Sequence, residues 1–143
     1  NMAEKYFNRF HSFCRSLSNL QKSKLADPKA DFVLEGTIQN YNLTFDLSWK
    51  VMKDILVKQL GITDFAIGSP RAVLQTAFTN GLIRDDVWMK MLKTRNLLAH
   101  DYDGTIAERK FDIIISGYYD AFTEFKNTVT KYYDGSQPSI DDF

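Results

Sequence analysis

Several side chains that could do chemistry lie close together near the middle of the second half of the chain: Arg95, Asn96, His100, Asp101 and Tyr102. An arginine presents a planar fork of donors that suits a phosphate group, and a histidine exchanges protons near neutral pH. At about 100° per residue, one continuous helix would place Arg95 and Tyr102 about 20° apart, and Asn96 and His100 one turn apart. The same geometry separates Arg95 from His100 by about 140°. These residue types predict a phosphate-directed site.

A purely structural role accounts for the same residues. A histidine in the last turn of a helix often serves only to satisfy free carbonyls, and Arg95 could simply pair with an acidic neighbour such as Asp101. The residue types alone leave both interpretations open, because the choice depends on the elements that position these side chains.

Length and charge limit what the chain can be. Its 143 residues suit a single domain over residues 1–133, followed by an acidic C-terminal tail over residues 134–143. The sequence has 18 basic and 18 acidic residues and a formal net charge of zero, so no global charge draws it to polyanions or membrane surfaces. Any contact with a nucleic acid must therefore be local.

Cysteine and histidine are scarce: the chain has Cys14, His11 and His100. A single cysteine excludes an internal disulfide, and these three side chains cannot complete a four-ligand zinc site made of Cys and His alone. We expect no metal ion, no cofactor, and a reducing, cytoplasmic setting. The sequence contains no run of 18 or more apolar residues, so we expect no membrane association either.

Apolar residues recur every three or four positions along most of the chain, which is the period of an amphipathic helix. Hydrophobic residues make up 44% of the sequence, whereas 7 Gly and 3 Pro are too few for the many turns of a β-sandwich or barrel. The pattern predicts helices over about residues 3–25, 34–60, 70–79, 86–102 and 105–132. Short connections between them favour an all-α, up-and-down four-helix bundle with an additional short helix, the third in sequence.

Residues that favour helix termini mark several of these boundaries. Ser69 followed by Pro70 is expected to begin the third helix, and Asp85 to cap the fourth. The turn residues Asp103-Gly104 are expected to end the fourth helix, and Thr105 with Glu108 has the form of a capping box for the fifth. The candidate residues thus fall at the C-terminal end of the fourth helix.

Four segments, taken together, resemble one known family: Gly36-Thr37-Ile38-Gln39-Asn40-Tyr41 leading into Phe45-Asp46-Leu47-Ser48-Trp49-Lys50, Ser69-Pro70-Arg71, Trp88-Met89-Lys90-Met91, and Arg95-Asn96-Leu97-Leu98-Ala99-His100-Asp101-Tyr102. The last segment resembles the HEPN motif, an arginine followed after four to six residues by a histidine, one further residue and a tyrosine. The others resemble landmarks of the nucleotidyltransferase substrate-binding protein family, also called HepT-like, and the similarity covers about residues 5–130. Asp46 stands where relatives commonly have Glu, and Ala99 where they often have Ser.

The resemblance implies a helical bundle, usually a homodimer, that acts with a minimal nucleotidyltransferase encoded nearby. Related proteins are toxins of toxin–antitoxin pairs that cut RNA without a metal and are neutralised when the partner transfers AMP to the motif tyrosine, here Tyr102. Arg95 and His100 would then be catalytic, with Asn96 orienting His100 or the phosphate. An older interpretation of the family leaves the alternative open: a non-catalytic subunit that binds a nucleotide or substrate and only presents it to the nucleotidyltransferase.

Two further interpretations carry less weight. Gly68-Ser69 with Asp101 and Asp103 superficially resembles the metal site of a nucleotidyltransferase, but the intervening helical pattern offers no β-hairpin to hold the carboxylates. The polar residues of the second helix, among them Asp46 and Lys50, could line a ligand groove beside Tyr102. Such a stripe is more often a solvated face.

Overall fold

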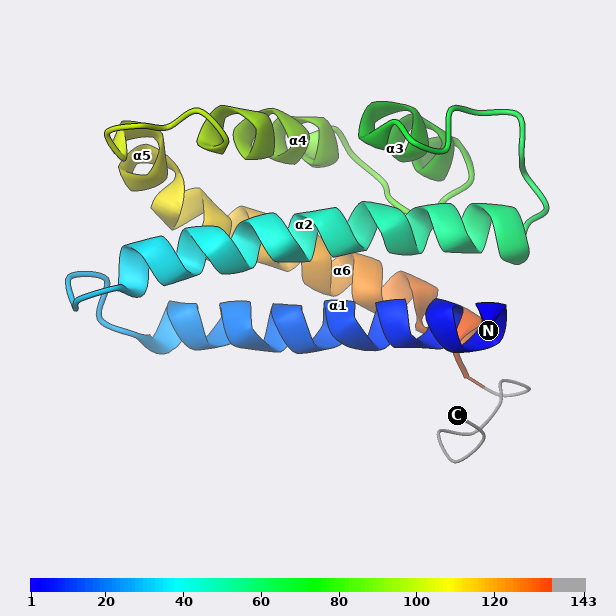
Figure 1. Ribbon diagram of the computed structural model, residues 1–143, viewed down its shortest axis with the longest axis horizontal. Helices are drawn as coiled ribbons and strands as arrows, with labels where there is room; N and C mark the ends of the chain where they lie inside the picture. The colour runs from blue at the N-terminus through cyan, green and yellow to red at the C-terminus, as the bar shows by residue number, and fades with distance from the viewer. Residues whose placement is uncertain (135–143) are drawn as a thin grey trace.

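A computed structural model of the chain describes residues 1–134, and every regular element in this part of the chain is helical (Figure 1). The elements are α1 (Met2–Leu25), α2 (Val33–Lys58), α3 (Pro70–Thr79), α4 (Val87–Leu98), α5 (Thr105–Ile113), the π-helical turn η1 (Ile114–Tyr118), α6 (Tyr119–Val129) and the short 3₁₀ turn η2 (Thr130–Tyr132). The all-α bundle prediction is confirmed. The predicted tail, residues 134–143, lies outside the described residues except for Asp134.

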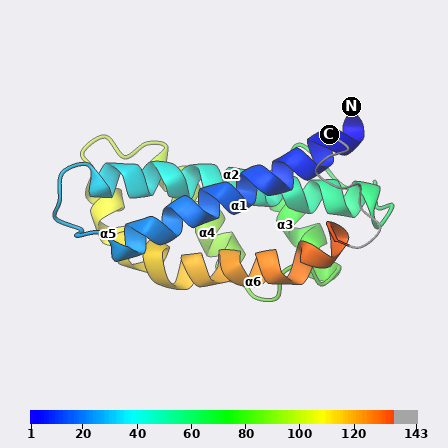
Figure 2. The ribbon, with the colours of Figure 1, turned by 90° about the horizontal axis from the view of Figure 1, so that it is seen from below.

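The long helices alternate in direction, and α3 is the additional short one (Figure 1). Helices α1 and α2 run side by side in opposite directions (Figure 1), α1 also contacts α6, and Figure 2 shows α1 crossing obliquely in front of α2. Helix α4 packs on the other side of α2, next to α3. No helix among residues 1–134 is both long enough and apolar enough to cross a bilayer.

Aromatic side chains fill the centre of the bundle, where Phe122 is fully buried and Phe125 is 1% exposed. The Phe122 ring meets Trp88 nearly edge to face, with centroids 5.6 Å apart, and lies 6.0 Å from Tyr41. Such pairs bury large apolar areas and add specific ring geometry. These contacts tie α2, α4 and α6 into one core.

Two buried polar links hold α4 in place just before the candidate site. The Tyr41 hydroxyl on α2 donates to the carbonyl of Met91 at 2.7 Å, and the hydroxyls of Thr94 and Tyr118 lie 3.0 Å apart. A buried hydroxyl without a partner would cost free energy, so these bonds favour one register of α4 against its neighbours. Arg95 follows directly after this anchored turn.

The predicted fourth helix is too long at its C-terminal end: α4 ends at Leu98, not near residue 102. The backbone N–H groups of His100 and Asp101 donate to carbonyls three residues back, which tightens the last turn. Gly104 then adopts a φ of 75°, a left-handed conformation that a glycine takes without strain. Residues 99–104 therefore form a turn that redirects the chain into α5.

The start of α5 also differs from expectation. Ser69 does cap α3, accepting from the N–H of Ala72 at 3.2 Å, but the expected capping box of Thr105 with Glu108 is wrong. The residue before α5 is Gly104, which has no side chain to cap with. The carboxylates of Asp101 and Asp103 instead accept the backbone N–H groups at the start of α5.

The predicted fifth helix is interrupted by a π-helical turn over Ile114–Tyr118. Gly117 lies in this turn, and a Cβ built on it would come within 3.0 Å of the Ile113 Cδ1 atom. A larger residue would therefore require the end of the Ile113 side chain, which is 40% exposed, to shift by a few tenths of an ångström. α5 and α6 follow each other through this turn without a loop between them.

Candidate functional site

The guanidinium of Arg95 is held by a carboxylate from another helix. Its Nε and Nη2 donate to Oδ1 and Oδ2 of Asp46 at 3.1 and 3.0 Å, a two-point pair between α4 and α2. This hydrogen bonding to Asp46 raises the pKa of Arg95, so the cation persists at any physiological pH. The side chains are 28% and 35% exposed, so the guanidinium is oriented yet still reaches solvent.

The partner of Arg95 corrects one expectation and reveals a residue that sequence reasoning missed. The suggested pairing of Arg95 with Asp101 is wrong, because Asp46 occupies the guanidinium. Asp46 lies on the polar stripe of α2, which the helical pattern assigned to solvent or to a ligand groove. Its place in the family-like segment 45–50 was the only sequence signal for a role beside Arg95.

Asn96 on α4 and His100 in the turn after it lie on a different side from that ion pair. Together with Arg71 of α3 and Lys93 of α4 they line a groove that also contains three apolar side chains, Met89, Leu92 and Leu97. Arg95 does not line this groove. The structure therefore brings Asn96 and His100 together, as the helical spacing predicted, and keeps Arg95 apart from them within one chain.

Tyr102 lies on the turn after α4 and is 97% exposed. Within residues 1–134 its side chain has no hydrogen bond, ion pair or ring contact. The expected placement of Arg95 and Tyr102 on one helical face is wrong, because it required α4 to continue past Leu98. The phenol instead projects into solvent two positions beyond His100.

Asp101 has both carboxylate oxygens engaged at the start of α5. Oδ1 accepts from the N–H of Ile106 at 3.0 Å, and Oδ2 accepts from the N–H of Ala107 at 2.8 Å. These N–H groups belong to the first turn of a helix, where no backbone acceptor is available, and a negative charge there also suits the helix dipole. Asp101 thus fixes the turn that carries Tyr102.

Replacing Asp101 with alanine should lower the free energy of unfolding by about 0.5–2 kcal/mol, the usual cost of losing a helix N-terminal cap. Urea denaturation measures this, and Asp101→Asn should retain part of the stability because its amide oxygen still accepts. Asp112→Ala, an exposed site on the same helix, is the matched control. Equal stability of Asp101→Ala and Asp112→Ala would contradict the capping role.

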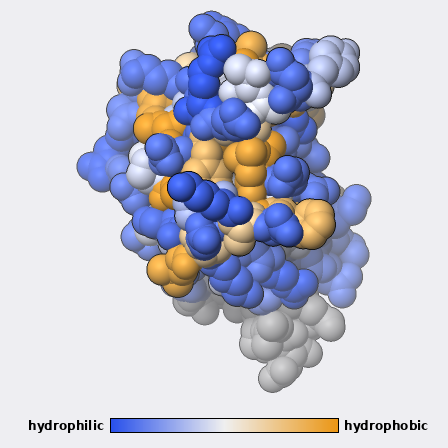
Figure 3. Space-filling view, turned by 90° about the vertical axis from the view of Figure 1, so that its left-hand side faces the viewer, coloured by the Kyte–Doolittle hydropathy of each residue, from blue (hydrophilic) through white to orange (hydrophobic). Residues whose placement is uncertain are grey.

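A second hollow opens on the end of the molecule viewed in Figure 3, where a band of apolar residues is surrounded by hydrophilic ones. Its lining combines Leu34, Ile38, Leu98 and Ala107 with the polar groups of Glu35, Gln39, Asn42 and Asp101. Among the described residues no cation lines it, whereas two carboxylates do. Charge therefore disfavours a phosphate here.

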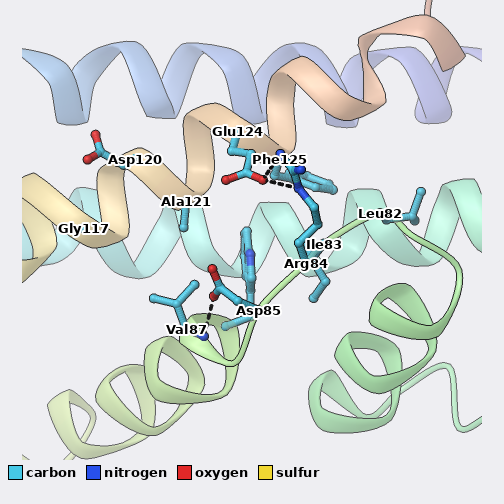
Figure 4. A pocket seen from close by; sticks show the side chains of 11 residues that line it. Leu82, Ile83, Arg84, Asp85, Val87, Gly117, Asp120, Ala121, Glu124 and Phe125 are labelled. Carbon is cyan, nitrogen blue, oxygen red and sulfur yellow. Dashed lines mark hydrogen bonds and ion pairs between the residues drawn. The ribbon is translucent and has the colours of Figure 1, made fainter.

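A third hollow lies between the start of α4 and α6 (Figure 4), and it is also mainly acidic. Arg84 extends across it to Glu124, with 2.6 Å between Nη2 and Oε1, while Asp85 and Asp120 add two further carboxylates. Trp88, 3% exposed, packs at its base. Of these three hollows, as residues 1–134 form them, only the groove beside His100 gathers cations without carboxylates.

Carboxylates that resembled metal ligands in the sequence have other roles. Among residues 1–134, no three or more His, Cys, Asp or Glu side chains lie close enough to share a metal ion. Asp101 and Asp103, which superficially resembled such ligands, both accept backbone N–H groups at the start of α5.

The sequence matches one known family over most of its length. A family model described as "Nucleotidyltransferase substrate binding protein like" matches residues 8–131. No curated protein matches the chain. The matched range takes in α2, the start of α3 with Arg71, and the whole of the segment from Arg95 to Tyr102.

Proposed function

Since the chain belongs to the nucleotidyltransferase substrate-binding protein-like family, we propose that it is the partner subunit of a minimal nucleotidyltransferase and a HepT-like toxin of a toxin–antitoxin pair. In this proposal the protein cuts RNA without a metal, using Arg95 and His100, and Asn96 orients His100 or the phosphate. The nucleotidyltransferase, encoded nearby, neutralises it by transferring AMP to Tyr102. The phenol of Tyr102, which is 97% exposed and has no partner within residues 1–134, is the observation that carries the proposal.

Cleavage of RNA by this route requires only proton transfer and charge stabilisation. The 2′-oxygen bonds to the neighbouring phosphorus as the bond from phosphorus to the 5′-oxygen breaks. The 2′-hydroxyl proton passes to a base, and the leaving 5′-oxygen takes a proton from water to become a hydroxyl. His100 suits the base, since its side chain is exposed in a groove with two cations. Arg95, oriented by Asp46, suits the charge that develops on the phosphate.

One protomer alone does not bring Arg95 and His100 into one groove. A two-fold symmetric dimer would present each of these side chains twice across one interface. Leu43 favours such an arrangement, because this apolar side chain is 53% exposed on the helix that carries Asp46. We therefore include a homodimer in the proposal.

Transfer of AMP to Tyr102 needs the phenol to enter the active site of another protein. The Tyr102 oxygen bonds to the α-phosphorus of ATP held by the nucleotidyltransferase, pyrophosphate leaves, and the phenol proton is lost. A tyrosine that is 97% exposed on a turn can enter such a site without unfolding any helix. The adenylyl group would then lie two residues along the chain from His100.

Co-expression with the neighbouring nucleotidyltransferase, followed by intact-mass measurement, tests this proposal. Wild-type protein should gain the mass of one or more adenylyl groups, and Tyr102→Phe should gain none. Tyr119→Phe, a half-buried tyrosine on α6, is the control and should be modified like the wild type. Equal modification of Tyr102→Phe and wild type would overturn the role of Tyr102.

The groove itself favours a second candidate. Arg71, Lys93 and His100 could hold the phosphate of a nucleotide without cutting anything, as a non-catalytic subunit presenting its substrate to the nucleotidyltransferase would require. Co-purification of the two proteins, with unchanged mass and no RNA cleavage, would favour this alternative.

A further inference from the structure

The groove between α3 and α4 concentrates positive charge in a chain whose formal net charge is zero. Arg71 and Lys93 are cations, His100 is cationic when protonated, and Asn96 adds a neutral donor and acceptor. In the described part of the chain, no carboxylate is among the residues that line it. A local positive potential of this kind attracts anions even where the whole molecule is neutral.

Arg71 and Lys93 make no ion pair that would stabilise the fold of residues 1–134. Arg9 pairs with Asp54 and Arg84 with Glu124, and Arg95 pairs with Asp46. Within residues 1–134, by contrast, neither Arg71 nor Lys93 has an ion pair or a side-chain hydrogen bond. Because nothing among these residues neutralises them, an anion from outside can bind without first breaking an internal contact.

The groove is extended along α4. Lys93 and Asn96 lie on α4, which ends at Leu98, and His100 follows in the turn beyond it. At 1.5 Å per residue, the helical stretch from Lys93 to Leu98 alone is about 7.5 Å long. Met89, Leu92 and Leu97 provide apolar surface between and beside the polar side chains. Charges spread over this length suit successive phosphates of a strand better than the single phosphate of a mononucleotide.

We propose that this groove binds the backbone of a single-stranded polynucleotide, with Arg71 and Lys93 as phosphate-binding residues outside the arginine–histidine–tyrosine motif. Under the function proposed above, on which this inference rests, the strand is the RNA to be cut. Its sugars and bases lie against the apolar side chains of the groove, and the phosphates on Arg71 and Lys93 continue the strand from the one beside His100. Base-edge readout plays no part, so binding is sequence-tolerant and depends on salt.

A fluorescent oligothymidylate tests this groove without interference from cleavage, because it lacks the 2′-hydroxyl that the proposed cleavage requires. Arg71→Ala and Lys93→Ala should each weaken binding about tenfold at low salt. In the double variant the slope of log affinity against log salt should become shallower by about 1.4, because each phosphate that the protein neutralises accounts for about 0.7 of that slope. Fluorescence anisotropy at several salt concentrations measures both.

The matched control is Lys22→Ala combined with Lys29→Ala, which removes the same charge from exposed sites outside the groove. It should bind like the wild type, and circular dichroism should show that all variants fold. Equal binding by the groove variant and this control would overturn the proposal. So would adenosine monophosphate binding as tightly as the oligonucleotide, since the occupant would then be a mononucleotide.

These outcomes are separable from those of the proposed function. If Tyr102 is modified and RNA is cut, yet Arg71→Ala and Lys93→Ala bind the oligonucleotide normally, only the groove assignment fails. If the groove variants lose binding but no cleavage or AMP transfer is found, the strand-binding groove is supported and the toxin function fails.

Discussion

Replacing His100 with alanine is expected to lower the rate of RNA cleavage by about 10²–10⁴-fold, the usual contribution of a positioned proton-transfer group. The imidazole lies in the cationic groove beside Asn96, where it can take the proton of a bound 2′-hydroxyl. The side chain is exposed and has no hydrogen bond or ion pair within residues 1–134, so the thermal midpoint should stay close to that of the wild type. Cleavage of an end-labelled RNA measures the rate.

His11→Ala provides the control for this experiment. His11 is exposed on α1, and its replacement removes the same chemical group from a surface with no assigned role. It should cleave RNA at the wild-type rate. An unchanged cleavage rate for His100→Ala would contradict the catalytic assignment directly.

The largest loss of stability is expected for Phe122→Ala, at about 3–5 kcal/mol of unfolding free energy. Phe122 is fully buried where α1, α2, α4 and α6 meet, and its ring contacts Phe13, Tyr41 and Trp88. Truncation removes its apolar burial and leaves a cavity that rigid neighbouring rings cannot fill. Urea unfolding followed by circular dichroism measures the change.

Phe78→Ala is the matched comparison, because Phe78 is 53% exposed on α3. We expect it to change stability by no more than about 0.5 kcal/mol, as surface substitutions usually do. A loss of stability at Phe122 no larger than at Phe78 would mean that the aromatic centre does not hold the bundle together.

Much of the fold could be predicted from the sequence, because its signals are local. Helical spacing of apolar residues located the bundle helices, and Ser69 followed by Pro70 marked the start of α3. The end of α4 could not be predicted from local spacing. It depends on Asp101, whose carboxylate accepts N–H groups five and six positions later, in the first turn of α5. The π-helical turn at Ile114–Tyr118 likewise carries no periodic signal of its own.

The candidate site was predictable in its residue types but not in its geometry. The segment from Arg95 to Tyr102 drew attention through its chemistry and its resemblance to a known motif. The pairing of Arg95 with Asp46 joins residues 49 positions apart, and Arg71 reaches the groove only because α3 packs against α4. Such contacts depend on tertiary packing, which helical periodicity cannot specify.

The central claim is that the protein cuts RNA without a metal and that AMP transfer to Tyr102 inhibits this cleavage. One measurement tests it most directly. RNA cleavage is followed in the presence of a chelator, before and after the protein has been treated with the nucleotidyltransferase and ATP. We predict cleavage that resists the chelator and falls in proportion to the adenylyl mass gained, with Tyr102→Phe escaping the inhibition. Cleavage that requires a metal, or that continues unchanged in fully modified protein, would contradict the proposed site and its control.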